Sequence, residues 1–346
     1  MKRIHLSVLV SVVGCLAASA ASAEVFCTNT VNEIHLALTE AGTNGQNDEI
    51  RIVAGTYGLT NGLGFSSEQT DSLSIRGGYN SNCTVFTGAT TTLDGQDKER
   101  PLFINIPNGN SSVEDLTFVN GLSTNNRGGG LRILSHSGDI RVDHNIFYAN
   151  RADDFGGALT ASTADGSLLI RNNLAFGNSS ANIGAFEFNQ TTGNAYIVGN
   201  TIFANISEGD FLPGGMHISG PATFTVSNNI IWGNVPEDAG PFISDFQSTA
   251  GSHSRYSNDI GVIGSGTVAA VVADELSVDP EFITCGFFCV SFELKRSSPL
   301  VDAGDDSPPG GMTQEDLAGK DRTIGAHVDI GAYENDRLFA DGFDDD

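Results

Sequence analysis

Five segments of the chain decide its fold: Val113-Glu-Asp-Leu-Thr-Phe-Val-Asn120, Val142-Asp-His-Asn-Ile-Phe-Tyr-Ala-Asn150, Ile170-Arg-Asn-Asn-Leu-Ala-Phe-Gly-Asn178, Val198-Gly-Asn-Thr-Ile-Phe-Ala-Asn205 and Val226-Ser-Asn-Asn-Ile-Ile-Trp-Gly-Asn234. Each segment closes on an asparagine: Asn120, Asn150, Asn178, Asn205 and Asn234. Self-similarity at a nearly constant period of this length is the signature of a repeat architecture. We therefore expect one structural unit for every ~28 residues, within the range of periods known for solenoids.

Apolar residues alternate with polar ones at the start of each unit, as in Leu168-x-Ile170 and Phe224-x-Val226. A period of two predicts short strands with one buried face. One rung of such strands cannot bury its own face, but stacked rungs can, and stacking places equivalent residues about 4.8 Å apart. The repeat therefore predicts an all-β solenoid.

Stacking also predicts what the recurring residues do. We expect the side-chain amides of Asn172, Asn200 and Asn228 to form a hydrogen-bonded ladder from rung to rung, and asparagine also tolerates the left-handed backbone of sharp turns. His144 falls in the same column and is therefore interpreted as a ladder member rather than a catalytic base. A buried aromatic column is expected from Phe118, Phe147, Phe176, Phe203 and Trp232.

These repeats resemble the right-handed parallel β-helix family, the pectin-lyase-like solenoid that pectate lyases share. Phe147-Tyr-Ala-Asn150 followed by Gly156-Gly-Ala-Leu159 is similar to the F-x-x-N and G-G-A-I signature of polymorphic outer-membrane-protein repeats. The resemblance implies the fold and a surface protein, and it says little about any reaction.

The ends of such a stack are open sheet edges that need covers. Thr30 and Glu33 fit a capping box, which predicts a capping helix over residues 30–41 within an N-terminal cap of residues 24–49. The β-helix is then expected over residues 50–284, beginning with Ile50-Arg-Ile52.

The C-terminal part carries a second resemblance. Its motifs are Asp279-Pro-Glu-Phe282, Ser298-Pro-Leu-Val-Asp-Ala-Gly304, Asp316-x-x-Gly319, Arg322 and Asp329-Ile-Gly-Ala-Tyr-Glu334. This series closely resembles the "choice-of-anchor Q" domain of bacterial exported β-helix proteins. Residues 285–334 are accordingly interpreted as a C-terminal capping segment of that type, followed by an acidic tail over residues 335–346.

The segment 1–23 has the order of a secretory signal peptide: Lys2 and Arg3, an apolar run, and the small residues Ala21-Ser22-Ala23. A retained membrane helix is excluded because the apolar run is too short to span a bilayer. Val12-Val13-Gly14-Cys15 is an alternative lipobox that would leave a lipidated Cys15. Either way the protein is expected at the bacterial cell surface, the outer membrane or outside the cell, with no transmembrane segment in the mature chain.

The expected mature chain contains four cysteines: Cys27, Cys83, Cys285 and Cys289. An even number in an exported protein predicts disulfides. Pairing Cys27 with Cys83 and Cys285 with Cys289 is the simplest of three connectivities. A zinc site is the weaker alternative, since no histidine lies nearby at ligand spacing.

The chain is strongly acidic, with 42 Asp and Glu against 17 Lys and Arg and a formal net charge of −25. Nucleic acid is excluded as a partner because phosphate contacts need clustered cations. Only 17% of the residues are charged and 39% are hydrophobic, so the chain is not an acidic disordered segment.

Two groups of acids are candidates for function. Asp302, Asp305, Asp306 and Asp329 are candidate Ca²⁺ ligands on glycine-rich loops; in the alternative, structural interpretation, Arg322 pairs with Asp329 or Glu334. The candidate catalytic carboxylates are Glu208, Asp210, Glu237 and Asp238. They lie in turns of neighbouring rungs, where a pair about 5 Å apart would match a retaining glycosidase.

The acids in these turns also have a non-catalytic explanation: they would form a solvated acidic edge that keeps the protein soluble. Arg141 and Arg171 are candidate bases of a lyase, but a cross-rung salt bridge between Arg171 and Asp143 accounts for that arginine. We therefore expect a non-catalytic module that binds a glycan or a cell surface. The alternatives are a polysaccharide lyase or glycoside hydrolase acting in a groove on the β-helix face, with or without Ca²⁺, and a passive structural layer.

Overall fold

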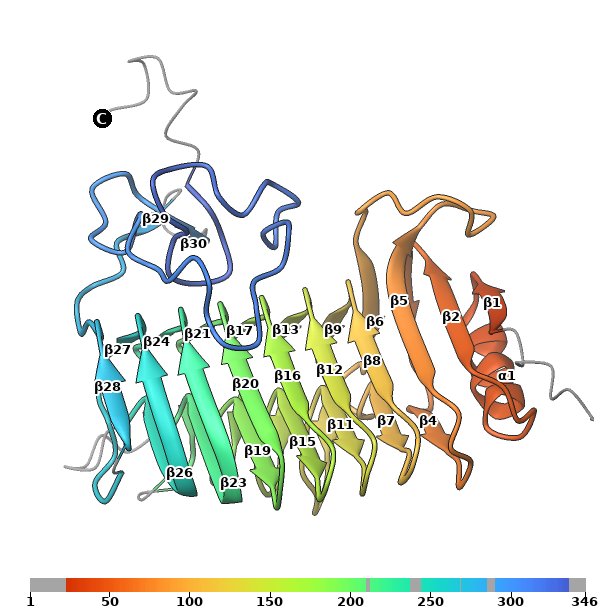
Figure 1. Ribbon diagram of the computed structural model, residues 1–346. Helices are drawn as coiled ribbons and strands as arrows, with labels where there is room; N and C mark the ends of the chain where they lie inside the picture. The colour runs from red at the N-terminus through yellow and green to blue at the C-terminus, as the bar shows by residue number, and fades with distance from the viewer. Residues whose placement is uncertain (1–22, 210–211, 237–243, 268, 285–289, 336–346) are drawn as a thin grey trace, which may run out of the picture.

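The computed structural model describes residues 23–209, 212–236, 244–267, 269–284 and 290–335 of the chain. Those residues form an all-β, right-handed parallel β-helix of about 7 turns, which confirms the predicted fold class. A C-terminal lobe lies on one side of the stack, and the only helix among the described residues covers its N-terminal end (Figure 1).

Three parallel sheets run along the stack. The 15-stranded sheet contains β1 (Glu24–Thr28), β2 (Asp48–Val53), β4 (Leu63–Ser66), β5 (Leu73–Tyr79), β7 (Leu102–Asn105), β8 (Ser111–Glu114), β11 (Leu131–Leu134), β12 (Ile140–Asp143), β15 (Leu159–Thr163), β16 (Leu168–Arg171), β19 (Phe186–Gln190), β20 (Asn194–Val198), β23 (Met216–Ser227), β26 (Phe246–Tyr256) and β28 (Val271–Ala273).

The 8-stranded sheet contains β3 (Gly55–Gly58), β6 (Thr91–Asp94), β9 (Thr117–Val119), β13 (Ile146–Tyr148), β17 (Leu174–Phe176), β21 (Thr201–Phe203), β24 (Ile230–Trp232) and β27 (Asp259–Ile260). The 5-stranded sheet contains β10 (Leu122–Ser123), β14 (Arg151–Ala152), β18 (Ser179–Ser180), β22 (Ile206–Ser207) and β25 (Val235–Pro236). Outside the stack, β29 (Phe282–Thr284) and β30 (Val290–Leu294) form an antiparallel pair in the lobe.

Two asparagine ladders run through the interior of the stack. The first joins Asn145, Asn173, Asn200, Asn229 and Asn258, each side-chain amide donating to the next side-chain oxygen at 2.9–3.1 Å. The second joins Asn150, Asn178, Asn205 and Asn234 in the same way and ends on the carboxylate of Asp245. All of these side chains are buried, so the ladders satisfy amides that would otherwise be costly to bury.

The predicted ladder was correct for Asn200 and wrong by one position for Asn172 and Asn228. Asn172 and Asn228 adopt the left-handed conformation, with φ of 52° and 56°, and the ladder member is the asparagine that follows each. The prediction was wrong for His144 in the same way: it takes the left-handed position, with φ of 55°, and Asn145 is the ladder member. In the unit between Asn172 and Asn228, Gly199 takes the left-handed position, with φ of 64°. Val198 pairs with Arg171 and Ser227, not with Ile170 and Val226, so aligning the units on Val198 grouped Asn200 with Asn172 and Asn228 instead of with Asn173 and Asn229.

The predicted aromatic column divides between two faces. Phe118 and Phe147 point inward, are fully buried and stack with ring centroids 5.0 Å apart. Phe176, Phe203 and Trp232 occupy the next position of the unit, which pairs with Tyr148 and faces outward. The prediction was wrong for these three because successive residues of a strand lie on opposite faces, so a shift of one residue exchanges inside and outside.

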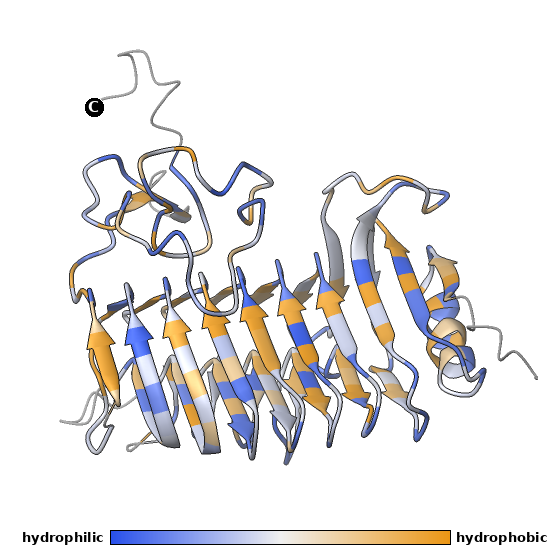
Figure 2. Ribbon diagram, viewed as in Figure 1, coloured by the Kyte–Doolittle hydropathy of each residue, from blue (hydrophilic) through white to orange (hydrophobic). Residues whose placement is uncertain are grey.

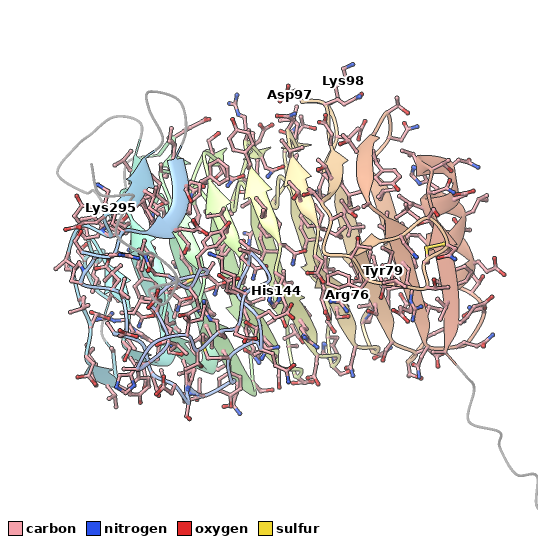
Figure 3. The ribbon with its side chains drawn as sticks, turned by 90° about the horizontal axis from the view of Figure 1, so that it is seen from above. Arg76, Tyr79, Asp97, Lys98, His144 and Lys295 are labelled. Atoms are coloured by element: carbon pink, nitrogen blue, oxygen red, sulfur yellow. A yellow bond between two sulfur atoms is a disulfide. The ribbon has the colours of Figure 1, made fainter. Side chains whose placement is uncertain are left out.

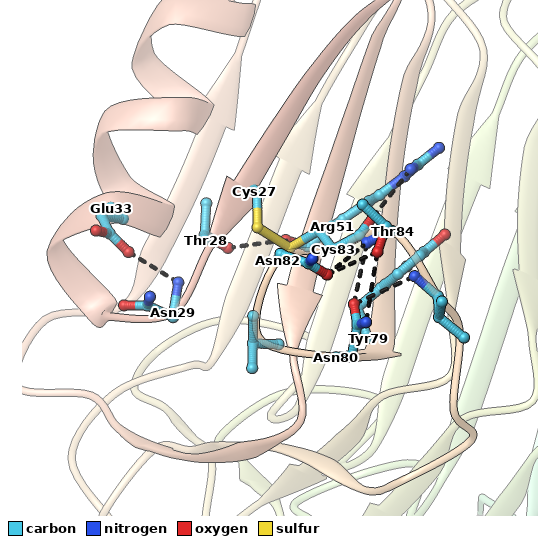
Figure 4. The surroundings of a disulfide bond; sticks show 12 residues. Cys27, Thr28, Asn29, Glu33, Arg51, Tyr79, Asn80, Asn82, Cys83 and Thr84 are labelled. Carbon is cyan, nitrogen blue, oxygen red and sulfur yellow. Dashed lines mark hydrogen bonds between the residues drawn. A yellow bond between two sulfur atoms is a disulfide. The ribbon is translucent and has the colours of Figure 1, made fainter.

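The N-terminal end is closed as predicted by helix α1 (Val31–Ala41), with a complete capping box between Thr30 and Glu33. The cap does not precede the stack, however, because β1 pairs with β2 as its first strand. A disulfide joins Cys27 on β1 to Cys83 in the loop that follows β5, as predicted (Figure 4). Cys285 and Cys289 lie outside the described residues.

The lobe is held against the 8-stranded sheet by an apolar cluster and by asparagines. Its buried apolar side chains, Phe282, Phe292, Leu294, Leu300, Val301 and Ile330, pack with the outward-facing aromatics of the sheet. Asn228 pairs with the backbone of Asp305 at 2.8 and 2.9 Å, and reorienting the Asn172 side-chain amide places its nitrogen 2.9 Å from the carbonyl oxygen of Ala332. The left-handed column of the stack is therefore a docking column for the lobe.

Removing one rung of the ladder is expected to destabilise the fold strongly. The change Asn200→Ala removes the acceptor of the Asn173 backbone N–H and one acceptor of the Asn173 side-chain amide. It also removes the side-chain donor to the Asn229 side-chain oxygen and to the Ile170 carbonyl. We expect a loss of about 3 kcal/mol in the free energy of unfolding, measured by urea denaturation. Exposed Asn189→Ala is the control, with an expected change within about 0.5 kcal/mol. Equal effects of the two changes would contradict the ladder's role.

Removing the N-terminal disulfide should also destabilise the protein. The sequence separation of the two cysteines is 56, and closing a loop of that length stabilises by about 4 kcal/mol in the chain-entropy model. The double change Cys27→Ser and Cys83→Ser is expected to lower the free energy of unfolding by that order. Adding reductant to the variant measures any contribution of Cys285 and Cys289 separately, and an unchanged midpoint in the variant would contradict the prediction.

Candidate functional site

A line of outward-facing polar side chains crosses five neighbouring strands of the 15-stranded sheet. Parallel pairing places them in register, one from each of β11, β15, β19, β23 and β26, and we call them the polar column: Arg132, Thr160, Glu187, His217 and Gln247. Hydrophilic bands lie between hydrophobic ones on these lower strands in Figure 2. The alternation puts the apolar neighbours, such as Phe186 and Phe188, into the core.

One arginine ties the polar column to the turn beside it. The Arg127 guanidinium lies 2.7 Å from the Glu187 carboxylate and 3.3 Å from that of Asp154. It also lies over the ring of Phe155, 4.3 Å from the ring centroid. Arg127 thus bridges two carboxylates from neighbouring parts of the face, and a planar guanidinium is well suited to do so.

Burial shifts the titration of two neighbours in the column. Glu187 is 7% exposed, and this burial raises the pKa of its carboxyl group, while Arg127 acts in the opposite direction. His217 is 9% exposed, and burial, with a contribution from Arg127, lowers its pKa to about 4. His217 is therefore neutral at pH 7, and its Nε2 lies 3.2 Å from the Thr249 hydroxyl. Perturbed groups of this kind cluster at functional sites.

The polar column also contains buried polar atoms that have no hydrogen-bond partner among the described residues. They are Arg132 Nε, Thr160 Oγ1, His217 Nδ1 and Gln247 Oε1, so four of the five members carry one. Buried polar groups are nearly always paired, because an unpaired one forfeits about 1–3 kcal/mol. These four atoms have almost no accessible surface, so a partner from outside the chain would contact the partly exposed side chains beside them, those of Arg127, Arg132 and Gln247.

The candidate catalytic acids of the turns are only partly placed by the structure. Glu208 is ion-paired with Arg151 at 3.3 Å, whereas Asp210, Glu237 and Asp238 lie outside the described residues. The two carboxylates that the structure does bring together are those of Asp154 and Glu187, which are both ion-paired with Arg127. The pairing of acids between the Glu208 and Glu237 turns therefore stays a prediction.

The four candidate calcium ligands each accept hydrogen bonds from loop backbone. Asp302 accepts from Ala326 N, Asp305 from Ser307 N, Asp306 from Val328 N, and Asp329 from Asp302 N and Asn335 N, at 2.7–2.9 Å. In the part of the chain that the structure describes, no group of three or more His, Cys, Asp or Glu side chains could hold a metal ion. In the structure, these carboxylates hold the loops of the lobe together by accepting hydrogen bonds from their backbone N–H groups.

The arginines that the sequence analysis singled out form ion pairs within the protein. Arg171 and Arg141 each approach Asp143 at 2.6 Å, so the predicted cross-rung salt bridge is present. Buried Arg322 lies 3.5 Å from Glu334, which confirms the predicted pairing in the lobe. Neither Arg141 nor Arg171 is positioned alone, as a lyase base would be.

Sequence reasoning missed Arg127, Glu187 and His217. A signal was present: Phe186-Glu-Phe188 and Met216-His-Ile218 both place a titratable residue between two core residues. The two segments are separated by about one repeat period, so they pair on neighbouring rungs. Finding this signal requires aligning the strands that follow the glycines of each repeat, in addition to the segments that end on asparagine.

No protein-family model matches the chain. Searches of curated proteins and of solved structures also found no match. Among the described residues, no helix has the length and apolar character needed to cross a membrane.

The depressed pKa of His217 makes a prediction about pH. The unfolded chain binds a proton near pH 6.5 and the folded one only near pH 4, so stability falls as pH drops through that window. His217→Gln should remove this part of the loss, up to about 3 kcal/mol. The difference between variant and wild type is the quantity to measure, because buried Asp259, with a pKa raised to about 7, titrates with the opposite sign.

Equal acid sensitivity of the two proteins between pH 6.5 and pH 4, followed by denaturant midpoints, would show that His217 does not remain neutral in the fold.

Proposed function

We propose that this protein is an exported, surface-located or secreted β-helix that binds a glycan along the polar column. The observation that carries the proposal is the registered line of polar side chains on five neighbouring strands of one outer face, in which Arg132, Gln247 and the adjoining Arg127 are partly exposed. A saccharide chain offers hydroxyl groups at regular intervals, and each hydroxyl both donates and accepts. Strands about 4.8 Å apart present their polar groups with comparable regularity.

Export is supported by two features. The Cys27–Cys83 disulfide is typical of proteins that fold in an oxidising compartment outside the cytoplasm. The segment 1–23 has the order of a signal peptide, and the repeats and C-terminal motifs resemble those of exported pectin-lyase-like and choice-of-anchor Q proteins. A cell-surface or extracellular glycan is a partner consistent with that location.

A specific observation also favours a second function, hydrolysis of a glycosidic bond. Arg127 holds the carboxylates of Glu187 and Asp154 within reach of one another. Glycosidases use two carboxyl groups, of which the proton donor has a raised pKa. In this alternative Glu187 protonates the leaving oxygen, because burial raises its pKa, and Asp154 acts as the base or nucleophile.

The test is a glycan-array and polysaccharide-degradation screen on residues 24–346, with Ca²⁺ and with chelator. We expect glycan binding that Glu187→Gln weakens at least about tenfold, since one charged hydrogen-bonding group is lost. Glu208→Gln is the control, because Glu208 is outside the polar column and pairs with Arg151. Thermal melting of both variants checks that they fold.

Each result of the screen has a defined meaning. New reducing ends that disappear, by about 10²-fold or more, in Glu187→Gln would establish the hydrolase. Binding without product supports the non-catalytic module. Binding that Glu187→Gln leaves unchanged, or no binding to any glycan of the array, would contradict the assignment of the polar column.

A further inference from the structure

A groove of about 830 Å³ lies between the stack and the C-terminal lobe, and none of its lining residues belongs to the polar column. Its floor is formed by outward side chains at the ends of β5, β8, β12 and β16. Residues 86–88 form one wall and residues 312–319 of the lobe form the other. We call it the lobe groove. In Figure 1 the loop that follows β5 and the C-terminal lobe lie on opposite sides of β8 and β12. A groove volume of this size is that of a small-molecule site.

Guanidinium and carboxylate groups alternate across the floor. Arg76 lies 2.6 Å from Asp115, and Arg141 lies 3.5 Å from Glu114 and 2.6 Å from Asp143. The side chains of Arg76 and Arg141 remain 34% and 45% exposed. Both arginines are therefore held by carboxylates and remain partly accessible to a ligand.

The lobe wall is fixed to the floor. His144 Nε2 lies 3.0 Å from the carbonyl oxygen of Glu315, and Arg171 donates to the carbonyls of Gly310 and Gly311 at 3.4 Å. Figure 3 places His144 beside the lobe and Arg76 on the N-terminal side of it. Because these contacts hold the floor and the lobe wall together, a ligand finds its polar partners already positioned, which reduces the entropy cost of binding.

The charges of the groove exclude an anionic ligand. Three guanidiniums line it, those of Arg76, Arg141 and Arg171, against four carboxyl groups, those of Glu114, Asp115, Glu315 and Asp316. The whole chain has a formal net charge of −25, which adds long-range repulsion of anions. A phosphate or uronate ligand would therefore meet neither a free cationic cluster nor a favourable field.

The shape and composition also disfavour a peptide with apolar anchors. Peptide and protein ligands are held mainly by large apolar side chains in desolvated pockets. The aromatic ring in the lining is Phe86, and the Arg76 guanidinium already lies over it at 3.9 Å. The groove instead presents hydrogen-bond donors, the arginine guanidiniums, that alternate with acceptors, the carboxylates of Asp and Glu.

We propose that the lobe groove is a binding site for a short neutral oligosaccharide, separate from the polar column and independent of it. Vicinal hydroxyl groups donate to the carboxylates and accept from the guanidiniums of one floor without any net charge on the ligand. The site is built jointly by the stack and the lobe, so the lobe has a binding role in addition to covering the 8-stranded sheet.

The experiment titrates the mature protein, residues 24–346, with neutral cello-, xylo-, malto- and chito-oligosaccharides and with oligogalacturonate, by calorimetry at millimolar ligand. The variant Arg141→Met removes an exposed guanidinium, and Asp143 keeps its 2.6 Å contact with Arg171. Arg151→Met is the matched control, since Arg151 is also exposed and ion-paired but does not line the groove. A second variant, Ala318→Trp, places a bulky ring on the lobe wall.

We expect at least one neutral oligosaccharide to bind, with affinity reduced about tenfold or more in Arg141→Met and in Ala318→Trp. Arg151→Met should bind as wild type does, and Glu187→Gln should retain this binding even if it abolishes binding at the polar column. The proposal is overturned if no neutral oligosaccharide binds, if oligogalacturonate binds more tightly, or if both groove variants bind like wild type.

Discussion

The structure depends on one constraint: every rung must stack on the next in the same register. Parallel pairing supplies backbone hydrogen bonds at each step, but these bonds would form equally well after a slip that keeps the same face inward. The asparagine ladders remove that freedom, because each buried amide donates to the side-chain oxygen of the equivalent asparagine in the next rung. A slip would leave several buried amides unpaired at once, and the penalty grows with the number of rungs.

Register in turn decides what each face of the molecule does. Inward positions are apolar and continuous, from Leu93 through Phe118 and Phe147 to Ile231. One step along the strand, the outward positions of the 8-stranded sheet hold the aromatics that bind the lobe. The outward positions of the 15-stranded sheet hold charged and hydroxyl groups in line. The core, the attachment of the lobe and the candidate sites therefore follow from a single alternation.

The solenoid, its period, its capping helix and the first disulfide could be predicted from sequence because each has a local signal. Thr30 and Glu33 form their capping box within one helical turn, and the closing asparagines recur visibly. The assignment of faces could not be predicted as well, since Asn172-Asn173 and Ala175-Phe176 each offer two residues for one position. Choosing between them needs the register, which is a long-range property. The polar column was missed for a related reason: Glu187 and His217 are informative only as neighbours, and a whole rung of sequence separates them.

The second ladder has a direction and an end. Every asparagine in it gives its amide hydrogen toward the C-terminal rung and receives one from the N-terminal side, but Asp245 has no amide to give. Its two carboxylate oxygens are taken by Asn234 and by the backbone N–H of Val262. A copied rung could be inserted anywhere before this residue and continue the chain of amides, whereas a rung appended after it would meet an acceptor facing an acceptor. The second ladder can therefore be lengthened by duplicated rungs only on the N-terminal side of Asp245, although strand pairing continues past this residue to β28.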